Sequence, residues 1–260
     1  QEEATGSSQD LKDANFTFRA NYNYNKRYMF EGTLSAMGSN KFEKGNQYFF
    51  ARAIGAAWVL SNESFLKDVE NVDFLKLKAS YGHLGYAGNT GFFLYRTNWK
   101  KGDKEEFRPT IGGNTTDLSR WGNPDLKWEY SNELNVGIEG LFFDNRLSTE
   151  INYFRELRKN IIGVNNAKYA ATGGDFIPYE NIGEVMNQGF DAYVNWNDKI
   201  GKDFIYNVGF NVTYTKNELR KSNELSNIEE YRKAIGRPTS TIFGWQAEGL
   251  FGKDIPLSLI

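Results

Sequence analysis

Carboxylates are the most numerous groups in this sequence that could do acid–base chemistry. The 260 residues include 33 Asp and Glu, enough for a pair of acids of the kind that hydrolyses glycosidic bonds. Paired-acid catalysis needs two carboxyl groups at a defined separation, however, and no motif here fixes one. The acids are scattered along the chain rather than gathered in one segment. We therefore expect no catalytic residue, and we do not interpret the chain as an enzyme.

Metal and cofactor chemistry has few candidates, because the chain has one histidine, His83, and no cysteine. A lone imidazole builds neither a histidine pair nor a zinc site of the usual nitrogen and sulfur kind. The glycine pairs at 112–113 and 173–174 lack the strand-to-helix setting in which glycine loops hold phosphates. We expect no metal, no cofactor and no nucleic-acid partner, since the net charge of −2 gives no basic footprint. His83 is interpreted as an interface or loop histidine at the end of a strand.

Aromatic side chains are the remaining candidates for binding. The long segment 84–125 contains Tyr95, Trp99 and Trp121, with further rings nearby. Such rings stack on sugar faces or pack against another protein, although ordinary packing within a loop would also use them. These three residues are therefore candidate contacts for a ligand or a partner.

The elements that carry these residues are predicted from strict period-two alternation, which is typical of strands with one apolar face. Residues 14–24 and 204–214 show it most clearly, and six further segments fit between them. The eight predicted strands are 14–24, 27–37, 48–60, 74–83, 126–142, 146–157, 182–196 and 204–214. Most have about ten residues or more, whereas soluble strands usually have five or six and about 9 to 11 tilted residues span a bilayer. The sequence therefore predicts an all-β, antiparallel transmembrane barrel wall.

The predicted connections alternate between short and long. Short links at 25–26, 61–73, 144–145 and 197–203 follow the odd strands, and long segments at 38–47, 84–125, 159–181 and beyond 215 follow the even ones. Outer-membrane barrels have short periplasmic turns and long extracellular loops, so the asymmetry gives an orientation. Two aromatic girdles then follow, with Tyr22, Tyr24, Tyr28, Trp58, Trp196 and Tyr206 at the periplasmic ends and Tyr48, Tyr81, Trp128, Tyr130, Tyr153 and Tyr214 at the outer ends.

Charged residues of the predicted strands share the face opposite the apolar one, where they would line a polar lumen. They are Arg19, Arg27, Glu31, Lys76, Lys78, Glu129, Glu133, Glu139, Glu150 and Asp191. Arg52 is the exception, because it lies on the apolar face of its strand. Only a position near the outer rim or a contact with another protein would make its burial in lipid inexpensive.

Six segments, in strand order, resemble SusC-like TonB-dependent transporters. They read Gly38-Ser39-Asn40-Lys41-Phe42, Lys76-Leu77-Lys78-Ala79-Ser80-Tyr81-Gly82, Asn123-Pro124-Asp125-Leu126-Lys127-Trp128-Glu129, Asn145-Arg146-Leu147-Ser148, Asn181-Ile182-Gly183-Glu184-Val185-Met186-Asn187-Gln188-Gly189-Phe190-Asp191 and Phe243-Gly244-Trp245-Gln246-Ala247-Glu248-Gly249-Leu250-Phe251. Asn-Arg and Asn-Pro-Asp also have a plain reading as turn residues. In the last segment Glu248 stands where the family commonly has Asp, a conservative difference.

The resemblance implies a Gram-negative outer-membrane, multi-pass barrel of about 22 strands with an internal plug. It also implies import of oligosaccharides or peptides powered through TonB, with a SusD-like surface lipoprotein as a lid. On this view residues 1–260 are a partial barrel domain, and the plug domain, the TonB box and the remaining strands lie elsewhere. Tyr95, Trp99 and Trp121 become candidate substrate or lid contacts.

Two other classes remain open from the residues themselves. One is an outer-membrane barrel with a structural or adhesive role and no transport; the other is a soluble carbohydrate-binding β domain. We favour an incomplete wall, because an open sheet edge is not tolerated in hydrocarbon and a closed eight-stranded barrel has little room for charged side chains. Residues 239–251 are predicted to form a further strand of the same wall.

Overall fold

The computed structural model of the chain describes residues 10–88, 90–108, 111–165, 167–169, 176–225 and 227–244. Its elements are β1 (Asp13–Tyr24), β2 (Tyr28–Ser39), β3 (Tyr48–Val59), η1 (Leu60–Asn62), β4 (Val72–Tyr86), β5 (Asn98–Arg108), β6 (Ile111–Arg120), β7 (Glu129–Phe142), β8 (Leu147–Val164), β9 (Tyr179–Ile200), β10 (Phe204–Lys221) and η3 (Glu230–Arg232). The expected all-β class is confirmed.

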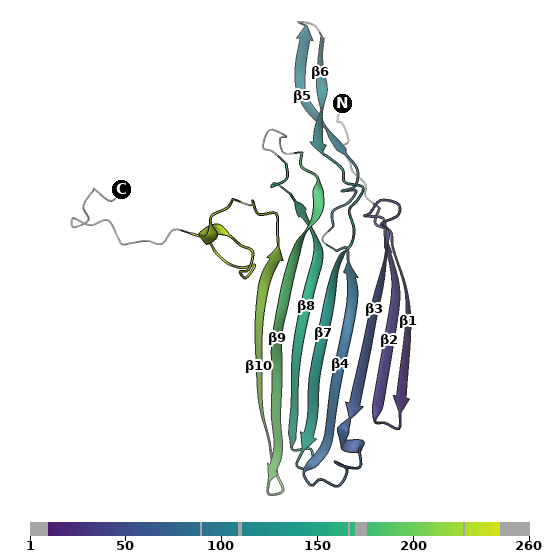
Figure 1. Ribbon diagram of the computed structural model, residues 1–260, viewed down its shortest axis with the longest axis vertical. Coiled ribbons are helices and arrows are strands. Elements are labelled where there is room, and N and C mark those ends of the chain that lie inside the picture. Colours follow the sequence, from purple (N-terminus) through teal and green to yellow (C-terminus); the bar gives the residue numbers. More distant parts are fainter. Residues whose placement is uncertain are drawn as a thin grey trace, which may run out of the picture.

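Eight of the strands form one tall antiparallel sheet in the order β1-β2-β3-β4-β7-β8-β9-β10 (Figure 1). Each strand pairs with its neighbour in sequence, except where β5 and β6 intervene between β4 and β7. Those two strands pair only with each other and rise above the end of the sheet as a separate hairpin (Figure 1). The eight predicted wall strands are therefore confirmed, and the hairpin within the predicted loop 84–125 is an addition.

Several predicted boundaries are wrong. β8, β9 and β10 have 18, 22 and 18 residues, so β8 continues to Val164 and β10 continues to Lys221 where loops were expected. β7 begins at Glu129, three residues later than predicted, and β4 runs past His83 to Tyr86. Within the predicted strand 239–251, residues 239–244 are not in a strand, and residues 245–251 lie outside the described part.

The predicted asymmetry between short and long connections is confirmed. The tight turns lie at one end of the sheet, and the long segments with the β5–β6 hairpin lie at the other (Figure 1). Asn25 and Lys26 have φ of 51° and 55°, and Asp144 and Asn145 have φ of 58° and 61°. Asn and Asp tolerate this left-handed conformation better than most residues, which explains their presence in the turns.

The register places the apolar and polar residues of the wall on opposite faces. Phe18 pairs with Leu34, Leu77 with Ile138, and Val194 with Phe210, so apolar side chains run across the whole sheet on one face. We call this the apolar face. The expected lipid-facing set belongs to it by parity in the ladder: Phe16, Phe18, Leu34, Leu134, Val136, Ile138, Phe210 and Val212.

Soluble proteins bury most of their large apolar side chains, whereas many of those in the strands of this wall are exposed. Phe16 is 76% exposed and Phe210 is 67% exposed, although both lie within long regular strands. A soluble protein rarely leaves so wide an apolar surface uncovered. Among the described residues, helices of a length and hydropathy suited to crossing a membrane are not found.

Candidate functional site

The long connections are anchored by a small core of their own, which lies beyond the end of the sheet. Phe42, Leu94, Leu126 and Trp128 are each at most 5% exposed and contact one another. The Phe42 and Trp128 rings stack with centroids 5.2 Å apart. Because these residues come from three different connections, the core holds the loops in one arrangement. Trp128 therefore does not belong to the outer aromatic girdle, where the sequence analysis placed it.

Hydrogen bonds to the main chain join the same connections. The Trp128 indole nitrogen donates to the Asn46 carbonyl oxygen at 3.1 Å, and Asn46 Nδ2 donates to the Pro124 carbonyl oxygen at 3.2 Å. Asn123 Nδ2 donates to the Tyr179 carbonyl oxygen at 2.7 Å. Asn-Pro-Asp is thus more than a turn, since its first side chain fixes the first residue of β9.

A buried ion pair closes the outer end of β7 and β8. Glu129 is 2% exposed, accepts from Arg158 Nη2 at 2.5 Å and accepts from the Ile162 amide at 3.1 Å. A buried carboxylate needs such partners, because an unpaired charge away from water is costly. The expectation that Glu129 would line a wet lumen wall is wrong, because its side chain instead joins β7 to the outer part of β8.

The three aromatic candidates lie at and on the β5–β6 hairpin. Tyr95 precedes β5, Trp99 is within β5 and 58% exposed, and Trp121 follows β6 and is 51% exposed. The entry and exit of the hairpin lie side by side, because the Gly122 amide donates to Thr97 Oγ1 at 3.2 Å. The described contacts include no ring pair between any two of the three candidates. The structure thus brings their backbones to one region without forming an aromatic platform.

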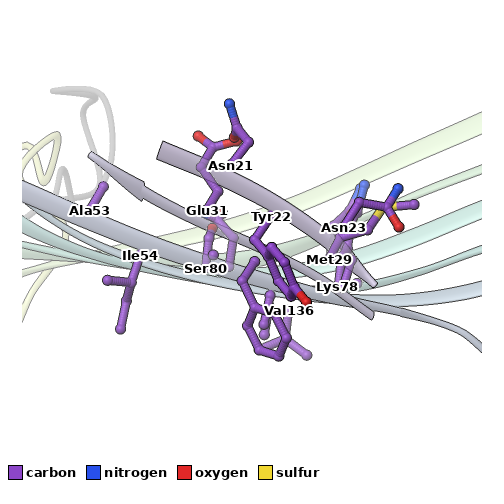
Figure 2. Close-up of a pocket in the computed structure, with 18 of the residues that line it drawn as sticks. Asn21, Tyr22, Asn23, Met29, Glu31, Ala53, Ile54, Lys78, Ser80 and Val136 are labelled. Atoms are coloured by element: carbon purple, nitrogen blue, oxygen red, sulfur yellow. The ribbon is translucent and has the colours of Figure 1, made fainter. Parts of the chain in front are cut away.

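A groove of about 880 Å³ lies along the wall and is lined by residues of both faces. Asn21, Glu31 and Lys78 belong to the polar face, and Tyr22, Ile54 and Val136 belong to the apolar face (Figure 2). The exposed apolar side chains suit contact with lipid, so the apolar face is the outside of the barrel. The opposite face, which carries the charged residues, then faces the lumen.

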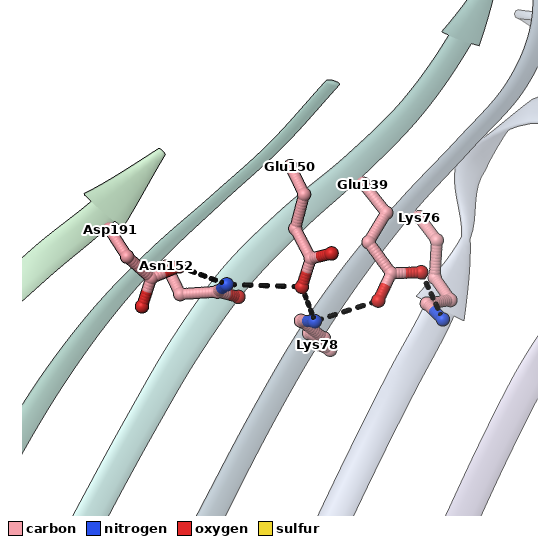
Figure 3. Close-up of polar contacts among 6 residues, drawn as sticks. All are labelled: Lys76, Lys78, Glu139, Glu150, Asn152 and Asp191. Carbon is pink, nitrogen blue, oxygen red and sulfur yellow. Dashed lines mark hydrogen bonds and ion pairs between the residues drawn. The ribbon is translucent and has the colours of Figure 1, made fainter. Parts of the chain in front are cut away.

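A ladder of ion pairs and hydrogen bonds crosses the polar face from β4 to β9 (Figure 3). Lys78 Nζ contacts Glu139 Oε1 at 2.7 Å and Glu150 Oε1 at 2.6 Å, and Lys76 pairs with Glu139. Asn152 Nδ2 then links Glu150 and Asp191, at 3.0 and 2.7 Å. The charges of the ladder largely neutralise one another, so it stabilises the wall and offers no isolated acid or base for catalysis.

Arg27 is not part of this lumen wall. It lies in the turn before β2, and its guanidinium contacts Glu63 at 3.3 Å. Glu63 is 9% exposed and also accepts hydrogen bonds from the Tyr28 hydroxyl at 2.7 Å and the Trp58 indole at 3.0 Å. These hydrogen bonds, that of Tyr28 first, lower the pKa of the Glu63 carboxyl below its ordinary value. The link after β3 is thereby joined to the periplasmic girdle, where Tyr24, Tyr28 and Trp58 stack in sequence.

His83 and Arg52 are neighbours on the outer half of the apolar face, where their backbones pair. His83 Nδ1 is 2.8 Å from Asn132 Oδ1, and its ring stacks on Phe49 with centroids 5.1 Å apart. Across the described ranges, metal-binding groups of three or more His, Asp or Glu side chains are not found. His83 is therefore a packed residue within β4 and not at its end.

Functional reasoning from the sequence missed the joint residues Phe42, Asn123 and Trp128. It also missed Asn181, whose side-chain amide makes two hydrogen bonds to the Lys127 backbone. The signal was available, because each of them lies in a segment that resembles a SusC-like transporter. Alternation could not find them, since they lie outside the regular part of the strands or at its margin.

Together, a face of exposed apolar side chains, an opposite face of charged side chains, short turns at one end and long anchored loops at the other define the wall of a membrane-spanning β-barrel. The family model described as "TonB dependent receptor-like, beta-barrel" matches residues 5–252, and the chain belongs to this family. Its members are multi-pass barrels of the Gram-negative outer membrane, and the wall described above lies in that membrane.

Curated relatives include TonB-dependent receptor P3 of Formosa agariphila, 30% identical over 204 residues, and TonB-dependent receptor SusC of Bacteroides thetaiotaomicron, 29% identical over 209 residues. Each alignment covers 78% of this chain, which spans about 20% of the length of either relative. Among solved structures, the RagAB peptide importer in its closed-closed state superposes with a TM-score of 0.74 at 23% identity, over 87% of this chain and 25% of that one. This likeness confirms the fold.

Proposed function

We propose that this chain is part of the barrel wall and outer loops of an importer that takes up oligosaccharides or peptides across the outer membrane. Membership of the TonB-dependent receptor family over residues 5–252 is the observation that carries the proposal. The relative named SusC and the structural neighbour titled a peptide importer support nutrient uptake. Both belong to longer proteins, so the activity belongs to the whole transporter and the present residues supply one part.

The open edges of the sheet support completion by further strands. β1 and β10 are the outermost strands of the described sheet. Each unpaired backbone group in hydrocarbon costs several kcal/mol, which an open edge multiplies along its length. Residues 1–260 are then one partial barrel domain, and the same polypeptide supplies the other strands, a plug inside the lumen and the contact with TonB.

The outer end of this wall is proposed to contact the substrate and a SusD-like lid. The β5–β6 hairpin projects beyond the sheet (Figure 1). Trp99 lies within β5 and Trp121 directly follows β6, and both rings are exposed. Exposed Trp side chains bury large areas when a partner covers them. Tyr95, Trp99 and Trp121 serve this contact, and no residue of the wall acts as a catalyst.

Uptake by cells that produce the complete transporter tests the proposal. Cells with the intact gene, cells without it and cells without TonB are given labelled oligosaccharides and labelled peptides in parallel. We expect accumulation of one of the two classes only when both the transporter and TonB are present. Equal accumulation in all three strains, with the barrel present in the outer membrane, would assign it a structural or adhesive role instead.

A further inference from the structure

Two cations lie at the outer limit of the apolar face, on β8 and β10, with β9 between them. Arg155 of β8 pairs with Gln188 of β9, and Gln188 pairs with Lys216 of β10, so the three residues form one rank across the sheet. Arg155 and Lys216 are both exposed. Adjacent strands lie about 4.8 Å apart, which puts the two cations on the order of 10 Å from each other at their backbones.

An aromatic rank lies directly beneath this polar rank, on the membrane side. Tyr153, Phe190 and Tyr214 are paired in register on the same three strands. Their exposed fractions are 43%, 45% and 57%, and Tyr153 Oη is 3.5 Å from Gln188 Oε1. Tyrosine rings gather at the boundary between hydrocarbon and polar head groups. Tyr153 and Tyr214 therefore mark the outer interface on β8 and β10, and Arg155 and Lys216, two residues farther out on the same strands, point into the head-group layer.

Within the described ranges, neither Arg155 nor Lys216 has an acidic partner, whereas neighbouring cations on the same strands do. Farther out on the same strands, Lys159 pairs with Glu184 at 3.7 Å and Arg220 pairs with Glu218 at 3.2 Å. On the polar face the cations of the ladder are paired as well. Arg155 and Lys216 are thus free to bind an anion from outside the wall.

We propose that Arg155, Gln188 and Lys216 bind the phosphate groups of a glycolipid of the outer leaflet, of the lipid A class. Phosphate is the fitting ligand, because guanidinium and ammonium groups bind it with charge-assisted hydrogen bonds. The amide of Gln188 lies between the two cations and supplies a neutral donor. The aromatic rank beneath contacts the sugar and the upper acyl chains. The complementarity of charge at this depth selects a lipid over a protein, whose contact would require carboxylates in the head-group layer.

Native mass spectrometry of the complete transporter in detergent tests the site with bisphosphorylated lipid A as the probe. The double variant Arg155→Gln/Lys216→Gln is expected to weaken lipid A binding about tenfold to thirtyfold, because each cation near anionic head groups contributes about 1 kcal/mol. Lys199→Gln/Lys202→Gln, which removes two charges from exposed positions at the opposite end, is the matched control and should bind like the wild type. Arg155→Lys/Lys216→Arg, which keeps both charges, should also retain binding.

Lipid A stripped of both phosphates should bind the wild-type barrel as weakly as intact lipid A binds the double variant. Equal binding of the two lipids, or equal binding by the wild type and the double variant, would overturn the proposal. A change in oligomeric mass or in protein partners with unchanged lipid binding would also overturn it and assign the rank to a protein contact. If the double variant assembles poorly, Arg155→Gln alone gives the same comparison with a smaller expected loss of about fivefold.

Discussion

The side-chain amide of Asn181 holds the backbone of Lys127 from both sides. Asn181 Oδ1 accepts from the Lys127 amide at 2.9 Å, and Asn181 Nδ2 donates to the Lys127 carbonyl oxygen at 2.8 Å. The same Nδ2 also donates to the Asn160 carbonyl oxygen at 2.8 Å. Residues 54 positions apart are thereby fixed at the base of the outer loops.

Asn181→Ala should loosen this joint without unfolding the wall. It removes the partner of a main-chain donor and acceptor, and a group left unsatisfied costs about 1 to 3 kcal/mol. Hydrogen exchange of the Lys127 amide in the complete barrel should accelerate by at least about tenfold. Asn211→Ala, on the polar face of β10 and outside the joint, is the control. Equal exchange at Lys127 in both variants would show that the amide clamp is not what holds the loop.

The Glu63 cluster predicts an acid-sensitive link between β3 and β4. The pKa of Glu63 is lowered in the folded protein, by the hydrogen bonds from Tyr28 and then Trp58. Its stabilising contribution is therefore present above the unfolded pKa of about 4.3 and is lost as the pH falls through the lower folded pKa. Proteolysis of residues 60–71 should rise in that acidic range for the wild type.

Glu63→Gln should show fast proteolysis of the link already at pH 7, with little further change on acidification. Glu70→Gln, in the same link but exposed, should behave like the wild type. A wild-type link that is cleaved at the same rate from pH 7 to pH 3 would contradict the prediction.

The ion-pair ladder should show measurable coupling between its members. Lys78 and Glu150 have side chains 32% and 40% exposed, whereas Arg19 and Glu31 form a pair with side chains 60% and 42% exposed. Partly exposed pairs contribute at most about 1 kcal/mol, and more exposed ones contribute less. A double-mutant cycle with Lys78→Met and Glu150→Gln should therefore give a coupling free energy of about 1 kcal/mol. The matched cycle at Arg19 and Glu31 should give less than about 0.5 kcal/mol, and the reverse order would refute the ranking.

The wall could be predicted from sequence because every strand of a membrane barrel faces lipid on one side and the lumen on the other. Side chains alternate between lipid and lumen, so the positions of Phe16 and Asn15 in the alternation are enough to assign each residue to its face. The turns were equally readable, since Asn25 and Asp144 are residue types that tolerate positive φ. The joint Trp128 was misread because a large ring near a strand end fits an interface and a loop core equally well.

The β5–β6 hairpin could not be predicted because it lies outside the sheet that imposes alternation. Asn98–Arg108 reads Asn-Trp-Lys-Lys-Gly-Asp-Lys-Glu-Glu-Phe-Arg, which has no period of two. The outer part of β8 could not be predicted for a related reason. The register shifts between Arg158 and Ile161, and apolar residues follow one another there, so the alternation is lost. Candidate contacts in the loops were chosen by residue type alone, and their placement depended on contacts distant in sequence.

The assigned faces predict that charged substitutions at adjacent positions lower barrel stability by very different amounts. Phe210→Arg places a charge in lipid near the middle of the wall and should lower barrel stability by about 2 to 4 kcal/mol. Asn211→Arg, one residue away on the polar face, should cost less than about 1 kcal/mol because water reaches it. Refolding of the complete barrel into lipid vesicles, followed by urea titration, measures the difference.

Cysteine labelling checks the same faces independently, because the sequence contains no cysteine. A lipid-phase probe should label cysteines at 16, 136 and 210. Preferential labelling at positions 15, 17, 135 and 211 would mean that the faces are reversed.

Removal of the β5–β6 hairpin should separate binding at the outer end from assembly of the wall. Asn98 and Arg120 are opposite each other in register, so residues 99–119 can be replaced by Asn-Gly as a two-residue turn. The shortened transporter should reach the outer membrane as a heat-modifiable barrel, because β5 and β6 pair only with each other. Ligand uptake and co-purification of the lid protein should both fall, since Trp99 and its projecting strand are lost. A finer test replaces Trp99 and Trp121 by Ala, which should weaken ligand or lid binding about thirtyfold if each ring contributes about 1 kcal/mol. Phe65→Ala, an exposed ring at the opposite end of the wall, is the matched control. Unchanged uptake together with unchanged lid association in the shortened protein would remove the hairpin from the proposed contact.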